Sequence, residues 1–194
     1  MRNLKNLMIA TVLIMVSTTI QAQEKWAIEL RPNLNFATDK IGDTDLKTGF
    51  GFELALNYNF MEHLGIYTGW GWNQFKSETS GGLEETDFEE TGYTFGLQFI
   101  HPLGNSDKLS YLVRAGGIYN HVEIENKEGD IVEDSGHGLG WEIGLGVQYG
   151  IGTTWFLRPQ IGYRALSGDF DVQGNKVDFD LNNIAIGLGI VKSF

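Results

Sequence analysis

The sequence alternates large apolar residues with small or polar ones over eight consecutive stretches. Phe50, Phe52 and Leu54, for example, alternate with Gly51 and Glu53. A period of two is typical of a β-strand whose two faces meet different surroundings. The pattern predicts an all-β protein with strands in residues 26–36, 49–60, 64–73, 92–99, 109–119, 139–149, 155–164 and 184–194.

The residues on the second face distinguish a membrane barrel from a soluble β-sandwich, which also alternates. A sandwich would favour Lys, Glu, Ser and Thr on its water-facing side, whereas this face is rich in Gly, with Asn, Gln and a few charges. Small and polar side chains suit the narrow interior of an eight-stranded barrel. Strands of about ten residues can also cross a bilayer when tilted. We therefore predict an eight-stranded antiparallel transmembrane up-and-down β-barrel.

The outward aromatic residues gather near the two ends of the predicted strands, and all five Trp share the outward parity. Aromatic residues at both membrane–water interfaces are typical of membrane barrels. One expected girdle contains Trp26, Phe60, Phe99, Tyr111, Tyr149, Trp155 and Phe194. The other contains Phe36, Phe50, Trp72, Tyr93, Tyr119, Trp141 and Tyr163.

The N-terminal segment has the layout of a secretory signal peptide. Arg2 and Lys5 precede an apolar run at 7–16, which small and polar residues follow up to Ala22. The run is too short to cross a bilayer as a helix, although a retained anchor helix is the alternative. We expect a signal peptide at 1–22 and a single barrel domain at 23–194. The chain has no Cys, so disulfides and a lipidated cysteine are excluded.

The connections between the predicted strands are of two kinds. Those after even-numbered strands are short, and those after odd-numbered strands are long. Short periplasmic turns and long outer loops are the rule for outer-membrane barrels, so both termini should be periplasmic. The short connections are 61–63, 101–108 and 150–154, and the long ones are 37–48, 76–90, 123–137 and 166–180. The first strand must pair with the last, because lipid tolerates no free sheet edge.

Charged residues on the inward face form the strongest candidate site. Unpaired charges in a closed lumen are costly, so these groups should be paired. The inward set is Glu29, Arg31, Glu53, Arg114, Glu142, Arg158 and Arg164. Strand adjacency predicts the pairs Arg31–Glu53, Arg114–Glu142 and Glu142–Arg158. The set is either a structural plug or a gate whose rearrangement would open a narrow water path.

The long connections are strongly acidic. The formal charge is −11, and loss of Arg2 and Lys5 would make it −13, which argues against a nucleic-acid partner. The acids are Asp39, Asp43, Asp45, Glu78, Glu84, Glu85, Asp87, Glu89, Glu90, Glu123, Glu125, Glu128, Asp130, Glu133, Asp134, Asp169, Asp171, Asp178 and Asp180. They form either a solvated surface or a site for divalent cations that bridge to lipopolysaccharide phosphates. No defined metal-binding loop is present, and no cofactor is expected.

The whole predicted mature chain resembles the small eight-stranded outer-membrane barrels of the OmpA transmembrane-domain and OmpX type. Such barrels end in Phe with apolar residues at alternate preceding positions, which the barrel-insertion machinery reads. Phe194, Ile190 and Leu188 match this signal, and Lys192 departs from it. The resemblance implies a monomer in the outer membrane of a Gram-negative-type cell, in contact with lipid and lipopolysaccharide.

A lipid A-modifying hydrolase is a further alternative, since some eight-stranded barrels carry a Ser, His and acid triad at the outer lipid edge. His121, His137, Ser135, Glu123 and Glu133 lie in one such region, but no motif of those hydrolases matches. We expect a non-enzymatic barrel whose acidic loops serve envelope integrity, adhesion or partner contact. A narrow gated pore for small solutes is the main alternative.

Overall fold

The computed structural model describes residues 25–41, 44–77, 87–106, 108–126, 130–172 and 175–194. The expected signal peptide at 1–22 lies outside these residues. Among the described residues, no helix has the length and apolar character that a bilayer crossing would need.

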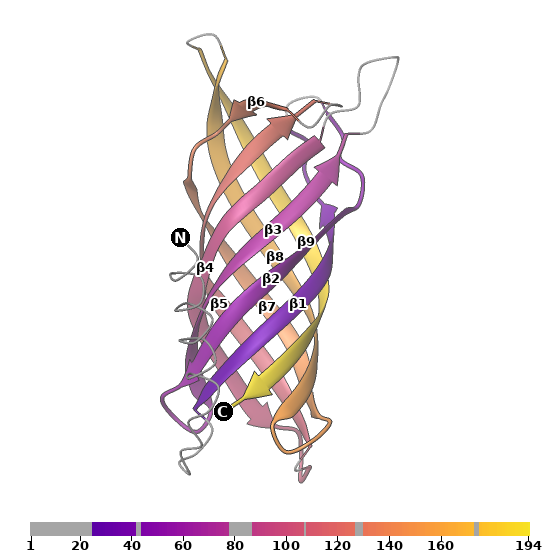
Figure 1. Cartoon of the computed structure of the whole chain (residues 1–194), viewed down its shortest axis with the longest axis vertical. Helices are drawn as coiled ribbons and strands as arrows, with labels where there is room; N and C mark the ends of the chain where they lie inside the picture. The colour runs from indigo at the N-terminus through magenta and orange to yellow at the C-terminus, as the bar shows by residue number, and fades with distance from the viewer. Residues whose placement is uncertain (1–24, 42–43, 78–86, 107, 127–129, 173–174) are drawn as a thin grey trace, which may run out of the picture.

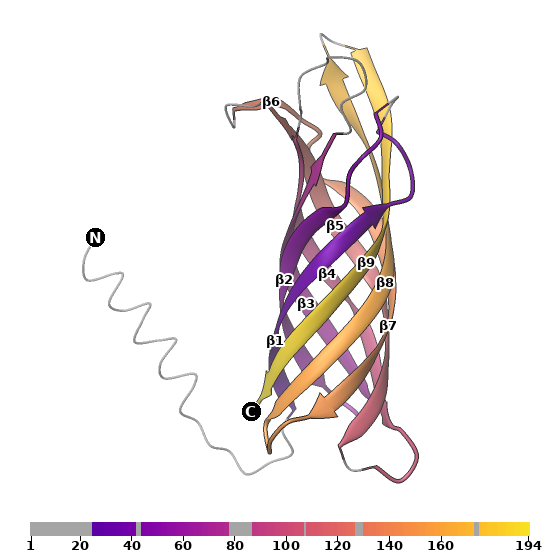
Figure 2. The ribbon, with the colours of Figure 1, turned by 90° about the vertical axis from the view of Figure 1, so that its right-hand side faces the viewer.

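Eight long antiparallel strands close into a barrel (Figures 1 and 2). They are β1 (Trp26–Ala37), β2 (Gly49–Asn59), β3 (Leu64–Lys76), β4 (Asp87–Pro102), β5 (Leu109–Glu125), β7 (Gly138–Gly150), β8 (Trp155–Val172) and β9 (Asn175–Ser193). Each strand pairs with the next one in the barrel, and β1 pairs with β9 to close it. The predicted eight-stranded barrel and the pairing of its first and last strands are confirmed.

A ninth strand, β6 (Ile131–Asp134), pairs with β5 outside the closed barrel. Several strands also run well beyond the predicted limits, at the end of the barrel opposite the C-terminus (Figure 1). The prediction of a loop at 166–180 was therefore wrong, because β8 and β9 occupy nearly all of it. In the predicted loop at 123–137, β5 and β6 occupy part of the segment. Of the predicted loop at 76–90, residues 87–90 belong to β4, and residues 78–86 lie outside the described residues.

The reason for this error is a reversal of polarity along the strands. In β8 the inward residues Leu166 and Phe170 are buried, whereas Asp169 and Asp171 lie on the other face. This part of the barrel presents charged groups outward and apolar groups inward, as a β-structure in water does. The residues still alternate with a period of two there, but the inward face is now apolar and the outward face is charged.

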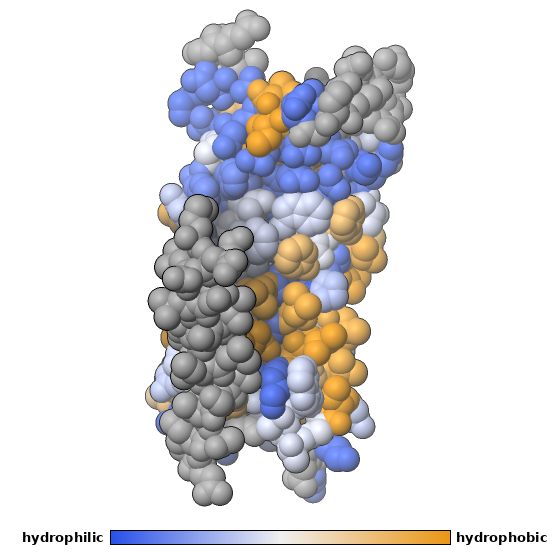
Figure 3. Space-filling view, in the orientation of Figure 1, coloured by the Kyte–Doolittle hydropathy of each residue, from blue (hydrophilic) through white to orange (hydrophobic). Residues whose placement is uncertain are grey.

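The lipid-facing surface is apolar over the middle of the barrel. Outward residues such as Leu54, Phe95 and Ile161 are about half exposed in this single chain. Figure 3 shows hydrophobic side chains below a hydrophilic end. Burial of such a band in lipid is what fixes a barrel across a membrane.

Candidate girdle aromatics pack against one another across neighbouring strands. The ring centroids of Trp141 and Tyr163 lie 5.5 Å apart. Those of Phe50 and Trp72 lie 5.4 Å apart at an edge-to-face angle. Such cross-strand pairs help to set strand register, in addition to any role at the membrane interface.

Candidate functional site

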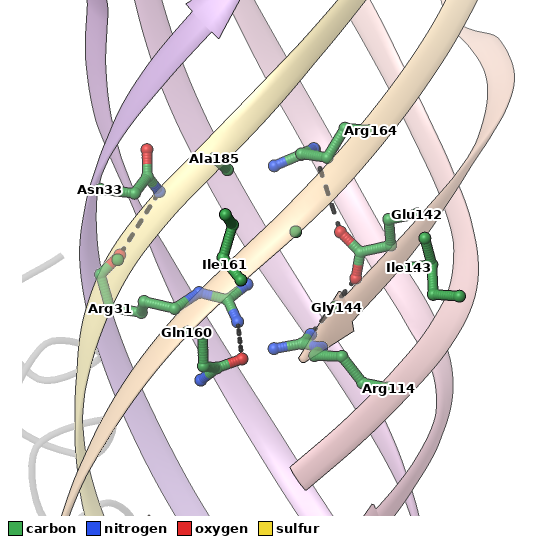
Figure 4. Close-up of a pocket in the computed structure, with 12 residues that line it drawn as sticks. Arg31, Asn33, Arg114, Glu142, Ile143, Gly144, Gln160, Ile161, Arg164 and Ala185 are labelled. Atoms are coloured by element: carbon green, nitrogen blue, oxygen red, sulfur yellow. Dashed lines mark hydrogen bonds and ion pairs between the residues drawn. The ribbon is translucent and has the colours of Figure 1, made fainter. Parts of the chain in front are cut away.

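The middle of the lumen is filled by charged side chains from six strands. Figure 4 shows four of these residues, Arg31, Arg114, Glu142 and Arg164. Arg31 Nη2 lies 2.8 Å from Glu53 Oε1. Arg114 Nη2 lies 3.0 Å from Glu53 Oε1 and 3.3 Å from Glu142 Oε1. Arg114 Nη2 therefore bridges two carboxylates, which is possible because this nitrogen carries two N–H donors. We call the whole set the lumen network: Glu29, Arg31, Glu53, Glu90, Arg114, Glu142, Arg158 and Arg164.

One expected pair, Glu142–Arg158, does not form, so that prediction was wrong. The β7–β8 register places Glu142 directly opposite Arg164, whose Nε lies 3.9 Å from Glu142 Oε2. Arg158 lies six residues earlier on β8, where its Nη1 is 2.5 Å from Glu29 Oε2. Adjacency of two strands does not fix which residues face each other, because the register decides it.

Glu90 is a member of the network that the sequence analysis assigned to a loop. Its carboxylate is 1% exposed and lies 3.0 Å from Arg164 Nη2. It also accepts hydrogen bonds from Asn73 Nδ2 at 3.0 Å and Asn120 Nδ2 at 2.6 Å. With Glu90, four carboxylates face four guanidinium groups, and the network is neutral. Extending the alternation of Gly92 and Thr94 by one step towards the N-terminus would have placed Glu90 inside.

Tyr67 is the second residue that sequence reasoning missed. Its hydroxyl donates a hydrogen bond of 2.7 Å to Glu142 Oε1, and the Arg114 guanidinium lies 3.8 Å from its ring centroid. Tyr67 therefore orients both partners of one ion pair. The sequence could have identified Tyr67, because it is an aromatic residue with inward parity in a stretch whose Trp residues face outward.

An apolar layer closes the lumen beyond the network, at the end opposite the C-terminus. Phe75, Ile118 and Val122 are fully buried there. Gly49 and Gly168 leave space for it, because a Cβ at either position would come within 2.8 Å of a phenylalanine ring. We call this set the apolar lumen core: Ile41, Phe75, Phe88, Ile118, Val122, Leu166, Phe170, Phe179 and Leu181.

The free space in the network is small. A cavity of about 30 Å³ lies among Arg31, Arg114, Glu142 and Arg164 (Figure 4), which is room for about one water molecule. A larger cavity of about 180 Å³, lined in part by Arg158, lies towards the end of the barrel that carries the C-terminus. The free space is therefore small among the charges in the middle of the lumen and larger towards the end that carries the C-terminus.

The histidines near the opposite rim do not form a hydrolase triad in the described part of the chain. The rings of His121 and His137 stack at 4.5 Å, and His121 Nδ1 lies 3.1 Å from Asp134 Oδ1. Ser135 Oγ instead bonds to backbone groups, accepting from Val122 N at 2.9 Å and donating to Gly136 O at 2.9 Å. A nucleophile needs a base within hydrogen-bond reach, and neither histidine makes that contact with Ser135.

The acidic groups of this rim influence one another. Partial burial and the nearby carboxylates of Glu89 and Glu123 raise the pKa of Glu125. Partial burial alone would raise the pKa of Asp134 as well, but hydrogen bonds from Gly136 N and His121 hold that pKa below its usual value. Several carboxylates therefore lie close together where β4, β5 and β6 meet.

Solved structures share this fold. Neisserial surface protein A has 15% identity, covers 87% of this chain and 97% of its own, and superposes with a TM-score of 0.63. OprG from Pseudomonas aeruginosa has 14% identity, coverage of 88% and 95%, and a TM-score of 0.60. Outer Membrane Protein W of E. coli has 15% identity, coverage of 89% and 100%, and a TM-score of 0.57.

No curated protein matches the chain. Residues 8–191 match the outer membrane protein beta-barrel domain. This match spans nearly the whole chain and agrees with the closed barrel, its apolar outer band and its packed lumen. The protein therefore belongs to the outer membrane protein beta-barrel domain family and resides in the outer membrane.

Proposed function

We propose that this protein is a closed, non-catalytic barrel that presents an acidic β-structured extension outside the cell for contact with other molecules. The extension consists of β6, the connection between β1 and β2, and the ends of β3, β4, β5, β8 and β9 opposite the C-terminus. The apolar lumen core carries this proposal. An ion that entered from the outer end would have to lose its water against the fully buried side chains of Phe75, Ile118 and Val122. Because a closed lumen cannot transport solutes, the protein would act through contacts that its external surface makes.

The orientation follows from the connections. The turns beside the C-terminus are short, at 60–63, 103–108 and 151–154. Short turns face the periplasm in barrels of this kind, which supports periplasmic termini and an extracellular position for the opposite end. The β8–β9 hairpin and β6 then extend outside the cell.

The charge of the extension supports a contact role with a positively charged partner. Asp169 and Asp178 lie directly opposite each other across β8 and β9. Like charges in this position weaken a hairpin, and the ion pair between Lys176 and Asp169 offsets only part of this repulsion, so the excess of acids favours a role in recognition over one in folding. The described acids of the extension are Asp39, Asp45, Asp87, Glu89, Glu123, Glu125, Asp130, Glu133, Asp134, Asp169, Asp171, Asp178 and Asp180, and the described lysines are Lys40, Lys47, Lys76 and Lys176.

Bilayer recordings test whether the barrel is closed. Purified wild-type protein in a planar bilayer should give no discrete conductance steps, because the apolar lumen core and the neutral network leave no water-filled path. A general porin inserted by the same procedure is the positive control. Steps from the wild type that change on Glu142→Gln would contradict the proposal and support a gated pore.

The contact role is tested with a variant of the hairpin. The barrel in neutral nanodiscs should associate with a polylysine-coated sensor, and the change Asp169→Asn, Asp171→Asn, Asp178→Asn and Asp180→Asn together should slow association on the order of tenfold. Glu62→Gln, at the opposite end, is the control and should have no effect. Equal association rates for the wild type and the quadruple variant would show that the hairpin does not make the contact.

A further inference from the structure

Strands β5 and β6 bring one imidazole and two carboxylates together on the outer face of the rim. His121 and Glu123 lie two residues apart on β5 and therefore share a face. Asp134 of β6 lies directly opposite Glu123 in the strand register. One potential ligand atom from each residue lies within 4.8 Å of those of the other two.

The individual contacts point towards a common centre. His121 Nδ1 is 3.1 Å from Asp134 Oδ1 and 3.8 Å from Glu123 Oε1. A metal ion can take the place of the proton that such a histidine–carboxylate pair shares, because both groups bind metals in their deprotonated forms. One nitrogen and two carboxylate oxygens are a donor set for Zn²⁺, whereas Ca²⁺ takes six or more oxygens.

The surroundings hold two of these ligands in place without a metal. The carboxylate of Asp134 accepts a second hydrogen bond, from Gly136 N at 2.8 Å. The His121 ring stacks on His137 with an interplanar angle of 13°, and the His137 ring lies 4.9 Å from that of Tyr119. Neighbouring groups that fix the orientation of a ligand raise metal affinity, because less freedom is lost on binding.

The charge around the three residues also favours a cation. Glu123 belongs to a second group with Glu89 and Glu125, whose carboxylate oxygens again lie within 4.8 Å of one another. A bound divalent ion would reduce the repulsion within this acidic group. The imidazole of His121 distinguishes the first group from the second and from the acidic hairpin tip.

We propose that His121, Glu123 and Asp134 form a Zn²⁺ site in which water completes the coordination. The bound ion would join β6 to the barrel wall, because two ligands come from β5 and one comes from β6. His137 acts as a positioning residue that keeps the His121 ring in place. The site lies outside the lumen, so this inference does not depend on whether the barrel conducts.

Zinc titration of the barrel without its predicted signal peptide, folded in detergent, tests the site. Calorimetry with Zn²⁺ should show one ion per barrel, and His121→Gln or Asp134→Asn should weaken binding at least about tenfold. His101→Gln is a matched control at the other end of the barrel and should bind as the wild type does. Absence of Zn²⁺ binding by the wild type, or equal binding by His121→Gln, would overturn the proposal.

Further measurements distinguish the residues that bind the ion from the residue that positions them. His137→Phe keeps the ring stack but removes the nitrogens, so it should retain binding within about tenfold; complete loss would show that the ligand set is wrong. Bound Zn²⁺ should also slow hydrogen exchange of the Ser135 amide, which bonds to Val122 O where β6 meets β5. Tighter binding of Ca²⁺ than of Zn²⁺, lost on Glu89→Gln, would indicate the all-oxygen group instead and overturn the zinc assignment.

Discussion

Replacing Arg114 with methionine is expected to lower the free energy of unfolding of the barrel by about 3–5 kcal/mol. The guanidinium of Arg114 contacts Glu53 at 3.0 Å and Glu142 at 3.3 Å, and all three groups are buried. Glu53 would retain Arg31 at 2.8 Å, but Glu142 would keep only the hydrogen bond from the Tyr67 hydroxyl and a long ion pair of 3.9 Å with Arg164. The loss arises because a buried carboxylate is left without a close positive charge. Urea unfolding from lipid vesicles measures it.

The exposed ion pair at the tip of β8 and β9 provides the control. Lys176 Nζ lies 3.0 Å from Asp169 Oδ1 in contact with water, and Lys176→Met should leave the urea midpoint unchanged. Combining Arg114→Met with Glu142→Gln should recover part of the lost stability, since the uncompensated charge is removed as well. Equal effects of Arg114→Met and Lys176→Met would show that the lumen network contributes no more than a surface pair.

The second large effect is expected at the apolar lumen core. Phe75→Ala should destabilise the protein by about 3–5 kcal/mol, because truncation of a fully buried ring leaves a cavity that its neighbours fill only in part. Phe75 lies near the outer end of β3, so the loss should be concentrated in the extension. Hydrogen exchange should accelerate at the outer ends of β3 and β4 more than in the middle of the barrel.

Phe75→Leu is the matched variant, since it keeps an apolar side chain in the same place. It should cost less than half as much as Phe75→Ala, because more of the volume remains filled. A change of less than about 1 kcal/mol for Phe75→Ala would mean that the apolar lumen core does not hold the extension together.

The membrane-spanning part of this fold could be predicted from the sequence because lipid imposes a strict rule. Every second side chain of a spanning strand must be apolar, and the others must fit a narrow lumen. This rule explains why the five Trp face outward, why the four arginines of the barrel face inward and why the first strand pairs with the last. The inward arginines could therefore be identified before their partners were known.

The extension could not be predicted in the same way, because the rule changes where the strands leave the membrane. Outside the lipid, Asp169 can face water while Phe170 faces the lumen, so the pattern no longer matches that of a spanning strand. The same change concealed Glu90, which lies just beyond the predicted start of its strand. Both errors arose because each strand was expected to end where its lipid-facing pattern ends, whereas several strands continue into water.

The sequence by itself determined the class of fold, the number of spanning strands and the inward position of every charge of the lumen network except Glu90, since these depend on alternation along single strands. Strand adjacency predicted the pairs Arg31–Glu53 and Arg114–Glu142, which form. Only the tertiary structure decided the other ion pairs of the lumen network, the packing of the apolar lumen core and how His121 comes to lie beside Asp134. These features depend on the register between strands and on how far each strand continues, and a shift of one residue would reverse every face. Local alternation does not determine the register between strands, and it shows where a strand ends only when the exchange of polarity outside the lipid is taken into account.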